Sequence, residues 1–243
     1  MTPPPAPSGA TAAVERALPL RTSGLLLDMD GTLIDSGPAV ERSWNLLFSE
    51  LGLDLEFGPQ QHGKPARQVL GELLPDMAEA DLTAAHRRIE ELEIQDVDGI
   101  LVLPGTERVL AELDEAAARL GRATWTIVTS CTSDLFEARW ARTGLAVPAG
   151  LVTADQVTRG KPAPEPYLLG AERIGLDAAA TVVVEDSIGG LESGSAAGAR
   201  TVAVTSTTPA GDLAPLADAL VTSLDDLEVA VDGEDLILAR RGS

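Results

Sequence analysis

Short, continuously apolar runs alternate with helical patterns along most of this chain, and that alternation restricts the fold more than any other feature. A strand that is apolar on both faces is typical of a parallel sheet that helices cover on both sides. Between the runs, apolar residues recur every three to four positions, which favours helices. The sequence therefore predicts an α/β fold built on a parallel sheet. We expect strands at residues 24–27, 123–128, 150–153, 181–184 and 201–204, and helices at 106–120, 133–143, 164–174 and 188–198.

Residues 37–103 interrupt this alternation and contain no convincing strand. Helical spacing covers about 38–51, a second helix is expected around Leu70, and Asp81 is the expected N-cap of a third helix. Turn residues bound the segment on both sides, so we interpret it as a small all-helical domain inserted after the first strand. The expected organisation is a flexible tail at 1–22, a core domain at 23–36 and 104–243, and a helical domain at 37–103.

Acidic residues outnumber basic ones by 38 to 18, which gives a formal net charge of −20 and a pI near 4.3. A surface of that sign repels nucleic acid and anionic lipid, so we expect neither as a partner. No uncharged apolar run approaches the roughly 18 residues that span a bilayer, and the N-terminal residues lack the basic and apolar regions of a signal peptide. A single cysteine, Cys131, cannot form an internal disulfide. These features predict a cytoplasmic protein.

Polar residues of a kind used in catalysis follow the predicted strands. In parallel α/β sheets the active site lies at the carboxyl ends of the strands, so these residues are expected to meet. Taken alone, each of them is more often part of a turn or a helix cap. Their joint occurrence, each after a suitable strand or in a loop, favours a single site. The residues are Asp28 and Asp30, Thr129 and Ser130, Lys161 in a Gly-Lys-Pro loop, and Glu185 and Asp186.

Up to four carboxylates would meet one ammonium in this crevice. Close carboxylates cannot all stay ionised without a compensating cation or raised pKa values. A bound divalent metal is the economical answer, and oxygen ligands without a His or Cys cluster favour Mg²⁺ over Zn²⁺. Asp186 is the candidate to hold that metal, with Glu185 as a second candidate.

Phosphoryl transfer needs an in-line nucleophile, a metal, and donors on the phosphate oxygens. Asp28 can attack phosphorus and form an aspartyl-phosphate. Asp30 can protonate the leaving alcohol and then act as the base on the hydrolytic water. Thr129, with the backbone N–H of Ser130, can hold phosphate oxygens. Lys161 can offset the negative charge on the phosphoryl group and on Asp28.

Four segments carry these residues: Asp28-Met29-Asp30-Gly31-Thr32-Leu33, Val128-Thr129-Ser130, Arg159-Gly160-Lys161-Pro162-Ala163-Pro164-Glu165-Pro166, and Val182-Val183-Val184-Glu185-Asp186-Ser187. Together they resemble the four signature motifs of the haloacid dehalogenase superfamily of phosphohydrolases, over about residues 23–225. The resemblance implies a Rossmannoid core, Mg²⁺ dependence and an aspartyl-phosphate intermediate. It also implies that Asp28, Asp30, Glu185 and Asp186 bind the metal, Asp30 through its main-chain carbonyl.

The helical insert is similar to the α-helical cap of the branch that contains β-phosphoglucomutase and small sugar phosphatases. Caps of this kind select the leaving group and exclude water as they close, so we expect hinges near 36–38 and 103–105. The segment 61–67 resembles the substrate-specificity loop of such caps, although a solvated turn before a helix is the alternative interpretation. The resemblance implies substrate contacts by His62, Gly63, Lys64 and Arg67.

Four residues carry expectations of their own. Among the 18 basic residues only Lys64 and Lys161 are lysines, and both are predicted to face the cleft where an anionic substrate must bind. Trp44 is interpreted as core of the insert, with a platform under the sugar as the alternative. Cys131 is interpreted as a tolerated small residue beside the phosphate loop, with oxidative inhibition as the alternative if its pKa is lowered.

The sequence thus predicts a Mg²⁺-dependent phosphatase of a small sugar or polyol phosphate, acting as a monomer or weak dimer. A phosphosugar mutase is the alternative enzyme, but Val40 stands where the mutase branch has a proton-handling His. A non-catalytic phosphate-binding or regulatory relative is disfavoured because Asp30 and Lys161 are both present. A receiver-like domain phosphorylated on Asp28 is disfavoured by the insert and by Asp30.

Overall fold

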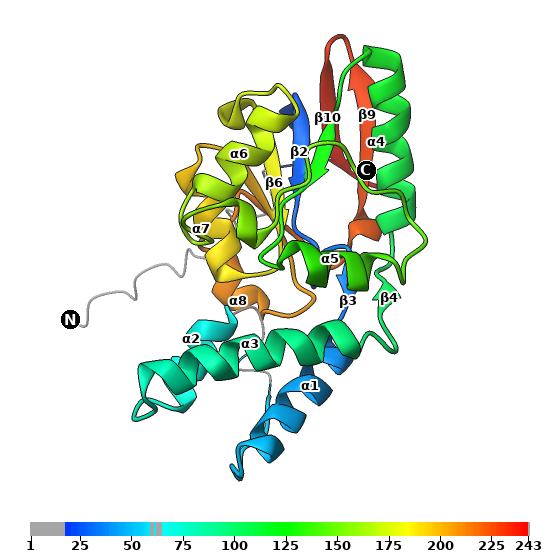
Figure 1. The fold of residues 1–243 in the computed structure, drawn as a ribbon. Helices are drawn as coiled ribbons and strands as arrows, with labels where there is room; N and C mark the ends of the chain where they lie inside the picture. Colours follow the sequence, from blue (N-terminus) through cyan, green and yellow to red (C-terminus); the bar gives the residue numbers. More distant parts are fainter. Residues whose placement is uncertain (1–17, 59–60, 62–64, 243) are drawn as a thin grey trace, which may run out of the picture.

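The computed structural model describes residues 18–58, 61 and 65–242, and a five-stranded parallel sheet forms the centre of this part of the chain (Figure 1). Its strands run in the order β5-β2-β6-β7-β8, so the first strand of the sheet lies between the later β5 and β6. This arrangement confirms the predicted parallel core. The strands are β2 (Gly24–Leu27), β5 (Trp125–Ile127), β6 (Thr181–Glu185), β7 (Arg200–Val204) and β8 (Ala219–Val221). The strand expected at 150–153 is reduced to a single parallel bridge between Val128 and Val152.

Helices cover both faces of the sheet, as the continuously apolar strands predict. Successive residues of β2 point to opposite faces: Leu25 and Leu27 pack in one buried cluster with Val109 and Phe136, whereas Leu26 packs in another with Tyr167. The helices are α4 (Thr106–Leu120) and α5 (Ser133–Trp140) on the first face, α6 (Glu165–Arg173) and α7 (Ile188–Ala196) on the second, and the short α8 (Ala210–Leu213). Short 3₁₀ turns lie at Ala154–Gln156, Ala178–Ala180 and Leu224–Asp226.

Among the described residues, three helices lie between β2 and α4 along the chain, on the side of the sheet where β2 ends (Figure 1). They bury a cluster of their own, which includes Trp44, Leu47 and Phe48 and is separate from the clusters of the sheet. The helices are α1 (Gly37–Glu50), α2 (Ala66–Leu73) and α3 (Glu79–Gln95). The expected N-cap of the third helix is wrong: α3 begins at Glu79, with Ala78 before it, and Asp81 lies in its first turn.

Two short strands join the helical insert to the rest of the chain. β3 (Ile34–Asp35) leads into α1 and pairs antiparallel with β4 (Leu101–Val102), which leads back towards α4. The interpretation of 37–103 as free of strands is therefore wrong at β4, because a two-residue strand has no period to detect. The pairing holds side by side the segment that enters the helical insert and the segment that leaves it.

A second sheet, of three antiparallel strands, was not expected. β1 (Leu20–Thr22) pairs with β10 (Asp235–Arg240), which pairs with β9 (Leu227–Asp232). β9 packs against α4, away from the insert (Figure 1). The predicted flexible tail at 1–22 is therefore wrong for residues 20–22, because their partner strand lies more than 200 positions away; residues 1–17 lie outside the described part of the chain.

Within the described residues, none of the helices has the length and apolarity needed to cross a membrane.

Candidate active site

Lys161 brings two strand ends together at the carboxyl edge of the parallel sheet. Its ammonium lies 2.5 Å from Asp28 Oδ1, which follows β2, and 2.7 Å from Glu185 Oε1, at the end of β6. It also donates to the main-chain carbonyl of Val128, past the end of β5, at 2.9 Å. The side chains of Lys161, Asp28 and Glu185 are 6%, 10% and 1% exposed. One buried cation therefore joins three adjacent strands, as the strand-end rule predicts.

Three buried carboxylates form a compact group at this point. Asp28, Glu185 and Asp186 each offer an oxygen, and these oxygens lie within 4.8 Å of one another. Burial raises the pKa of Asp28 well above its usual range. Lys161 opposes this shift, and the charges of Glu185 and Asp186 add to it. Burial and the charge of Glu185 raise the pKa of Asp186 to about 7. With one ammonium for three carboxylates, the donor set fits a hard divalent cation such as Mg²⁺.

Protein donors occupy both oxygens of Glu185. Lys161 and the hydroxyl of Tyr167 donate to Oε1, while the N–H of Asp186 and the N–H and hydroxyl of Ser187 donate to Oε2. Tyr167, from α6, is fully buried, and the Lys161 ammonium lies 4.9 Å from the centre of its ring. Glu185 thus orients Lys161, and protein donors already use both of its oxygens. Asp28 and Asp186 accept fewer hydrogen bonds and have more capacity left for a metal.

Two hydroxyls that the sequence analysis missed orient Asp186. Thr32 lies 3.4 Å from its Oδ1, and Thr207 donates to its Oδ2. Thr207 lies three residues past β7, so the same strand-end rule could have found it. Tyr167 gave no such signal, because an aromatic residue inside a helix is usually ordinary core.

Asp30 does not share the group around Asp28. Its Oδ1 accepts from the Ser36 hydroxyl at 2.6 Å and pairs with Arg139 at 2.9 Å, and the Cys131 thiol lies 3.1 Å from its Oδ2. The side chain of Asp30 is 25% exposed, more than those of Asp28 and Glu185. The acid–base candidate is therefore held beside the start of the insert.

The Thr-Ser pair lies past β5. Thr129 is buried, its N–H donates to the carbonyl of Val152 at 2.9 Å, and its hydroxyl accepts from the N–H of Cys131 at 3.1 Å. Ser130 is exposed. The contact between Thr129 and Cys131 is an ST turn, which a Thr can form without any ligand. The phosphate-binding role of Thr129 and Ser130 therefore stays a prediction.

Of the cap residues in the expected set, Arg67 alone can be placed. It lies on α2, is half exposed, and forms an ion pair with Glu79 of α3. His62, Gly63 and Lys64 lie outside the described residues, and with them the prediction that Lys64 faces the cleft. Trp44 is 2% exposed, stacks on Phe57 and donates its indole N–H to Glu93 at 3.1 Å. Its interpretation as core of the insert is confirmed.

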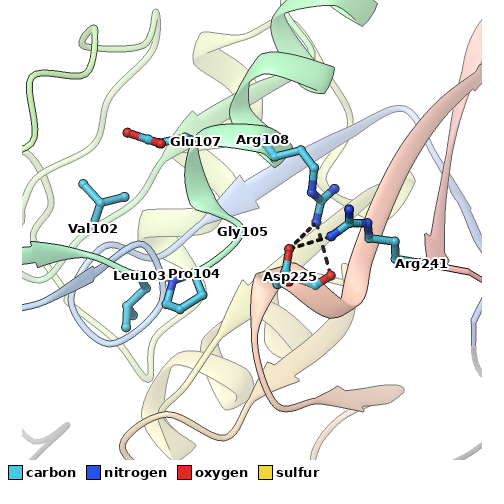
Figure 2. Close-up of a pocket in the computed structure, with 8 residues that line it drawn as sticks. All are labelled: Val102, Leu103, Pro104, Gly105, Glu107, Arg108, Asp225 and Arg241. Carbon is cyan, nitrogen blue, oxygen red and sulfur yellow. Dashed lines mark hydrogen bonds and ion pairs between the residues drawn. The ribbon is translucent and has the colours of Figure 1, made fainter.

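A separate hollow of about 450 Å³ lies between the segment from β4 to α4 and two residues that flank the C-terminal strands, Asp225 before β9 and Arg241 after β10 (Figure 2). Its two arginines, Arg108 and Arg241, both pair with Asp225, at 3.5 and 2.8 Å. Their charges are already matched, and none of the predicted site residues reaches it. Its lining comprises Val102, Leu103, Pro104, Gly105, Glu107, Arg108, Asp225 and Arg241.

Comparisons with known proteins bear on this site. Residues 22–198 match the family model for haloacid dehalogenase-like hydrolases. The chain is 41% identical to hexitol phosphatase A of Escherichia coli, over 76% of this chain and 84% of that protein. It is 30% identical to 2-deoxyglucose-6-phosphate phosphatase 1 of Saccharomyces cerevisiae, over 88% and 92%. A HAD hydrolase of family IA, variant 3, from Entamoeba histolytica shares the fold, with a TM-score of 0.72 at 20% identity, over 84% of this chain and 95% of that one.

Proposed function

Because the chain belongs to the haloacid dehalogenase-like hydrolases and is a phosphoric monoester hydrolase, we propose that it hydrolyses a small sugar or polyol phosphate through an aspartyl-phosphate on Asp28. One observation carries the proposal. A buried carboxylate that a lysine holds at 2.5 Å, in a group of three acids, is a nucleophile placed among the charges that phosphoryl transfer needs.

In the first step Asp28 attacks phosphorus, and the ester oxygen leaves with a proton from Asp30. Lys161 offsets charge on the phosphoryl group, while Thr129 and the N–H of Ser130 hold its oxygens. In the second step Asp30 takes a proton from the water that attacks the aspartyl-phosphate, which restores Asp28. Charge neutralisation at the phosphate is the chemistry that Mg²⁺ supplies when bound.

The metal would be held by Asp28, Asp186 and the main-chain carbonyl of Asp30, with Glu185 beside them. The fit rests on the charge imbalance of the buried group, in which Lys161 is the cation in contact with Asp28 and Glu185. All of these donors are hard oxygens, which Mg²⁺ prefers.

The substrate class is inferred from the relatives. A hexitol phosphatase and a 2-deoxyglucose-6-phosphate phosphatase are both named for small polyhydroxylated phosphate esters. We propose that residues 37–103 form the cap domain that selects this leaving group, over a core of 23–36 and 104–243. Arg67 and the loop residues His62, Gly63 and Lys64 are the proposed substrate contacts.

A phosphatase is favoured over a phosphosugar mutase by Val40, a half-buried residue of α1 that packs against the insert's own apolar cluster. Val offers no group that could handle a proton. The remaining attributes, a cytoplasmic location and a monomeric or weakly dimeric state, stay predictions.

The test is phosphate release from a panel of sugar, polyol and nucleotide monophosphates, with and without Mg²⁺. We expect release from sugar or polyol phosphates that needs Mg²⁺, and a loss of at least about a thousandfold in Asp28→Asn, because an amide does not attack phosphorus. Interconversion of hexose phosphates without phosphate release would favour the mutase. Release undiminished in Asp28→Asn would exclude the mechanism, and no turnover of any ester would favour a binding or regulatory role.

A further inference from the structure

The side chain of Asp30 is held from three directions. Ser36, at the start of the insert, donates to Oδ1 at 2.6 Å. Cys131, from the loop after β5, donates to Oδ2 at 3.1 Å. Arg139, from α5, pairs with Oδ1 at 2.9 Å. Ser36 stands at the N-cap position of α1 but makes no cap hydrogen bond, since its hydroxyl is turned to Asp30 instead.

Arg139 is also bound to the insert. Its second terminal nitrogen lies 3.2 Å from Oε2 of Glu93, a residue of α3. The guanidinium, in a side chain only 6% exposed, thus bridges a carboxylate of the core and a carboxylate of the insert. Glu93 in turn accepts from the indole of Trp44, on α1. A continuous series of contacts, Asp30–Arg139–Glu93–Trp44, thus links the proposed acid–base residue to the apolar core of the insert.

A second contact joins the core to the insert, one turn of α3 away from Glu93. Glu90 of α3 accepts a hydrogen bond from the hydroxyl of Thr132, the residue before α5. Glu90 and Glu93 lie on one face of α3, three positions apart, and both meet the segment that continues from the Thr129 loop. The insert is therefore docked through polar contacts to the two parts of the core that hold Asp30 and Thr129.

Burial opposes the charged form of both groups in this bridge, and the facing charges work against that effect. Burial lowers the pKa of the Arg139 guanidinium, but the facing carboxylates of Asp30 and Glu93 more than reverse this, so it stays protonated. Burial raises the pKa of Glu93, against the opposing effect of Arg139. A buried ion pair often contributes no more to folding than an apolar side chain of the same volume, so fold stability alone gives little reason for it.

We propose that Arg139 is a positioning residue of the acid–base step, which fixes the orientation of Asp30 and couples it to the placement of α3 through Glu93. The inference rests on the proposed function, because it takes Asp30 as the proton donor to the leaving group. A guanidinium suits the role, because its two terminal nitrogens lie in one rigid plane and each pairs with a different carboxylate, Asp30 or Glu93, which fixes the directions of both partners.

The test uses two substrates that differ in the need for that proton. The leaving alcohol of a hexitol phosphate needs protonation, whereas 4-nitrophenolate leaves without it. kcat/KM reports the first irreversible step, so it isolates transfer to Asp28 from the later hydrolysis. In Arg139→Met we expect kcat/KM for the hexitol phosphate to fall about tenfold or more, and for 4-nitrophenyl phosphate less than about threefold. Arg142→Met, an exposed position three residues further on, is the matched control.

Coupling to the insert is tested in the same assay. Glu93→Gln should produce a smaller loss with the same substrate preference, and Arg139→Met/Glu93→Gln should lose no more than Arg139→Met alone. Arg139→Lys should restore part of the selective loss, and it carries the comparison if Arg139→Met does not melt cooperatively. Equal losses on both substrates, or additive losses in the double variant, would overturn the inference and leave the proposed function intact. A wild-type protein that hydrolyses neither ester would overturn both.

Discussion

The ammonium of Lys161 lies 2.5 Å from Oδ1 of Asp28, across 133 positions of sequence. The same ammonium lies 2.7 Å from Glu185, whose remaining oxygen is held by the main chain at the start of α7. Lys161 therefore fixes the position of Asp28, the candidate nucleophile, and Glu185 fixes the position of Lys161. The side chains of Lys161 and Asp28 are both at least 90% buried. Several consequences of this arrangement can be measured.

Lys161→Met should destabilise the metal-free protein and abolish activity. Removal of one partner leaves Asp28 and Glu185 buried without their cation, a change that costs about 3–5 kcal/mol in buried pairs. Urea unfolding in EDTA measures the change in the free energy of unfolding. Arg159→Met, two residues earlier and 73% exposed, should stay within about 0.5 kcal/mol of wild type. Equal stability of the two variants would contradict the account of Lys161.

Mg²⁺ should stabilise the protein more at pH 8 than at pH 5.5. The folded-state pKa of Asp186, raised from 3.8 to about 7, lies above its unfolded value, so the folded state retains a proton that the unfolded state releases. That contribution is present below about pH 4 and is lost as pH rises through 7, by an amount of the order of 4 kcal/mol at most. Mg²⁺ replaces the proton where the carboxylates are ionised.

The measurement for this pH effect is the Mg²⁺-induced rise in Tm at the two pH values. Asp186→Asn should lower the rise at pH 8 and flatten the pH dependence of the metal-free Tm. A rise as large at pH 5.5 as at pH 8 would show that protons and Mg²⁺ do not compete for this group.

Gly190→Ala should impair the site, while its neighbour Gly189→Ala should not. A Cβ at Gly190 would lie 1.8 Å from Cδ and Oε1 of Glu185, whereas a Cβ at Gly189 meets nothing within 4 Å. The first variant must displace Glu185, so we expect a loss of about tenfold or more in kcat and about 1–3 kcal/mol in stability. The second should gain up to about 1 kcal/mol from helix propensity. Phosphate release and urea unfolding compare the pair, and equal behaviour would refute the close approach.

Cys131 should be inert in the folded protein. Cys131 is 6% exposed, and burial together with the neighbouring Asp30 raises the pKa of its thiol well above the usual range, so little thiolate forms. Iodoacetamide should modify the native protein at less than about a tenth of the rate seen in urea, by mass spectrometry of the intact chain. Comparable rates would revive the alternative of a redox-sensitive thiol.

Local patterns determined much of this protein. The mainly apolar runs at β2, β5, β6 and β7 can be recognised without the rest of the chain, because a strand buried on both faces carries few polar side chains, such as Thr126 of β5. Asp28, Glu185 and Asp186 follow those runs directly, so a parallel sheet carries them to one edge. The spacing of apolar residues predicted the helical insert in the same way, although a two-residue strand such as β4 has no period.

Tertiary structure decided the rest. Asp28 and Asp30 are two positions apart, yet Asp28 pairs with Lys161, whereas the side chain of Asp30 is engaged by Ser36, just before α1, and by Arg139 of α5. The pairing of β1 with β10, and the contacts of Tyr167 and Arg139, likewise join segments separated by many residues. A sequence period reports which face of an element is buried, but not which element covers it; that depends on how helices and strands distant in the chain pack together.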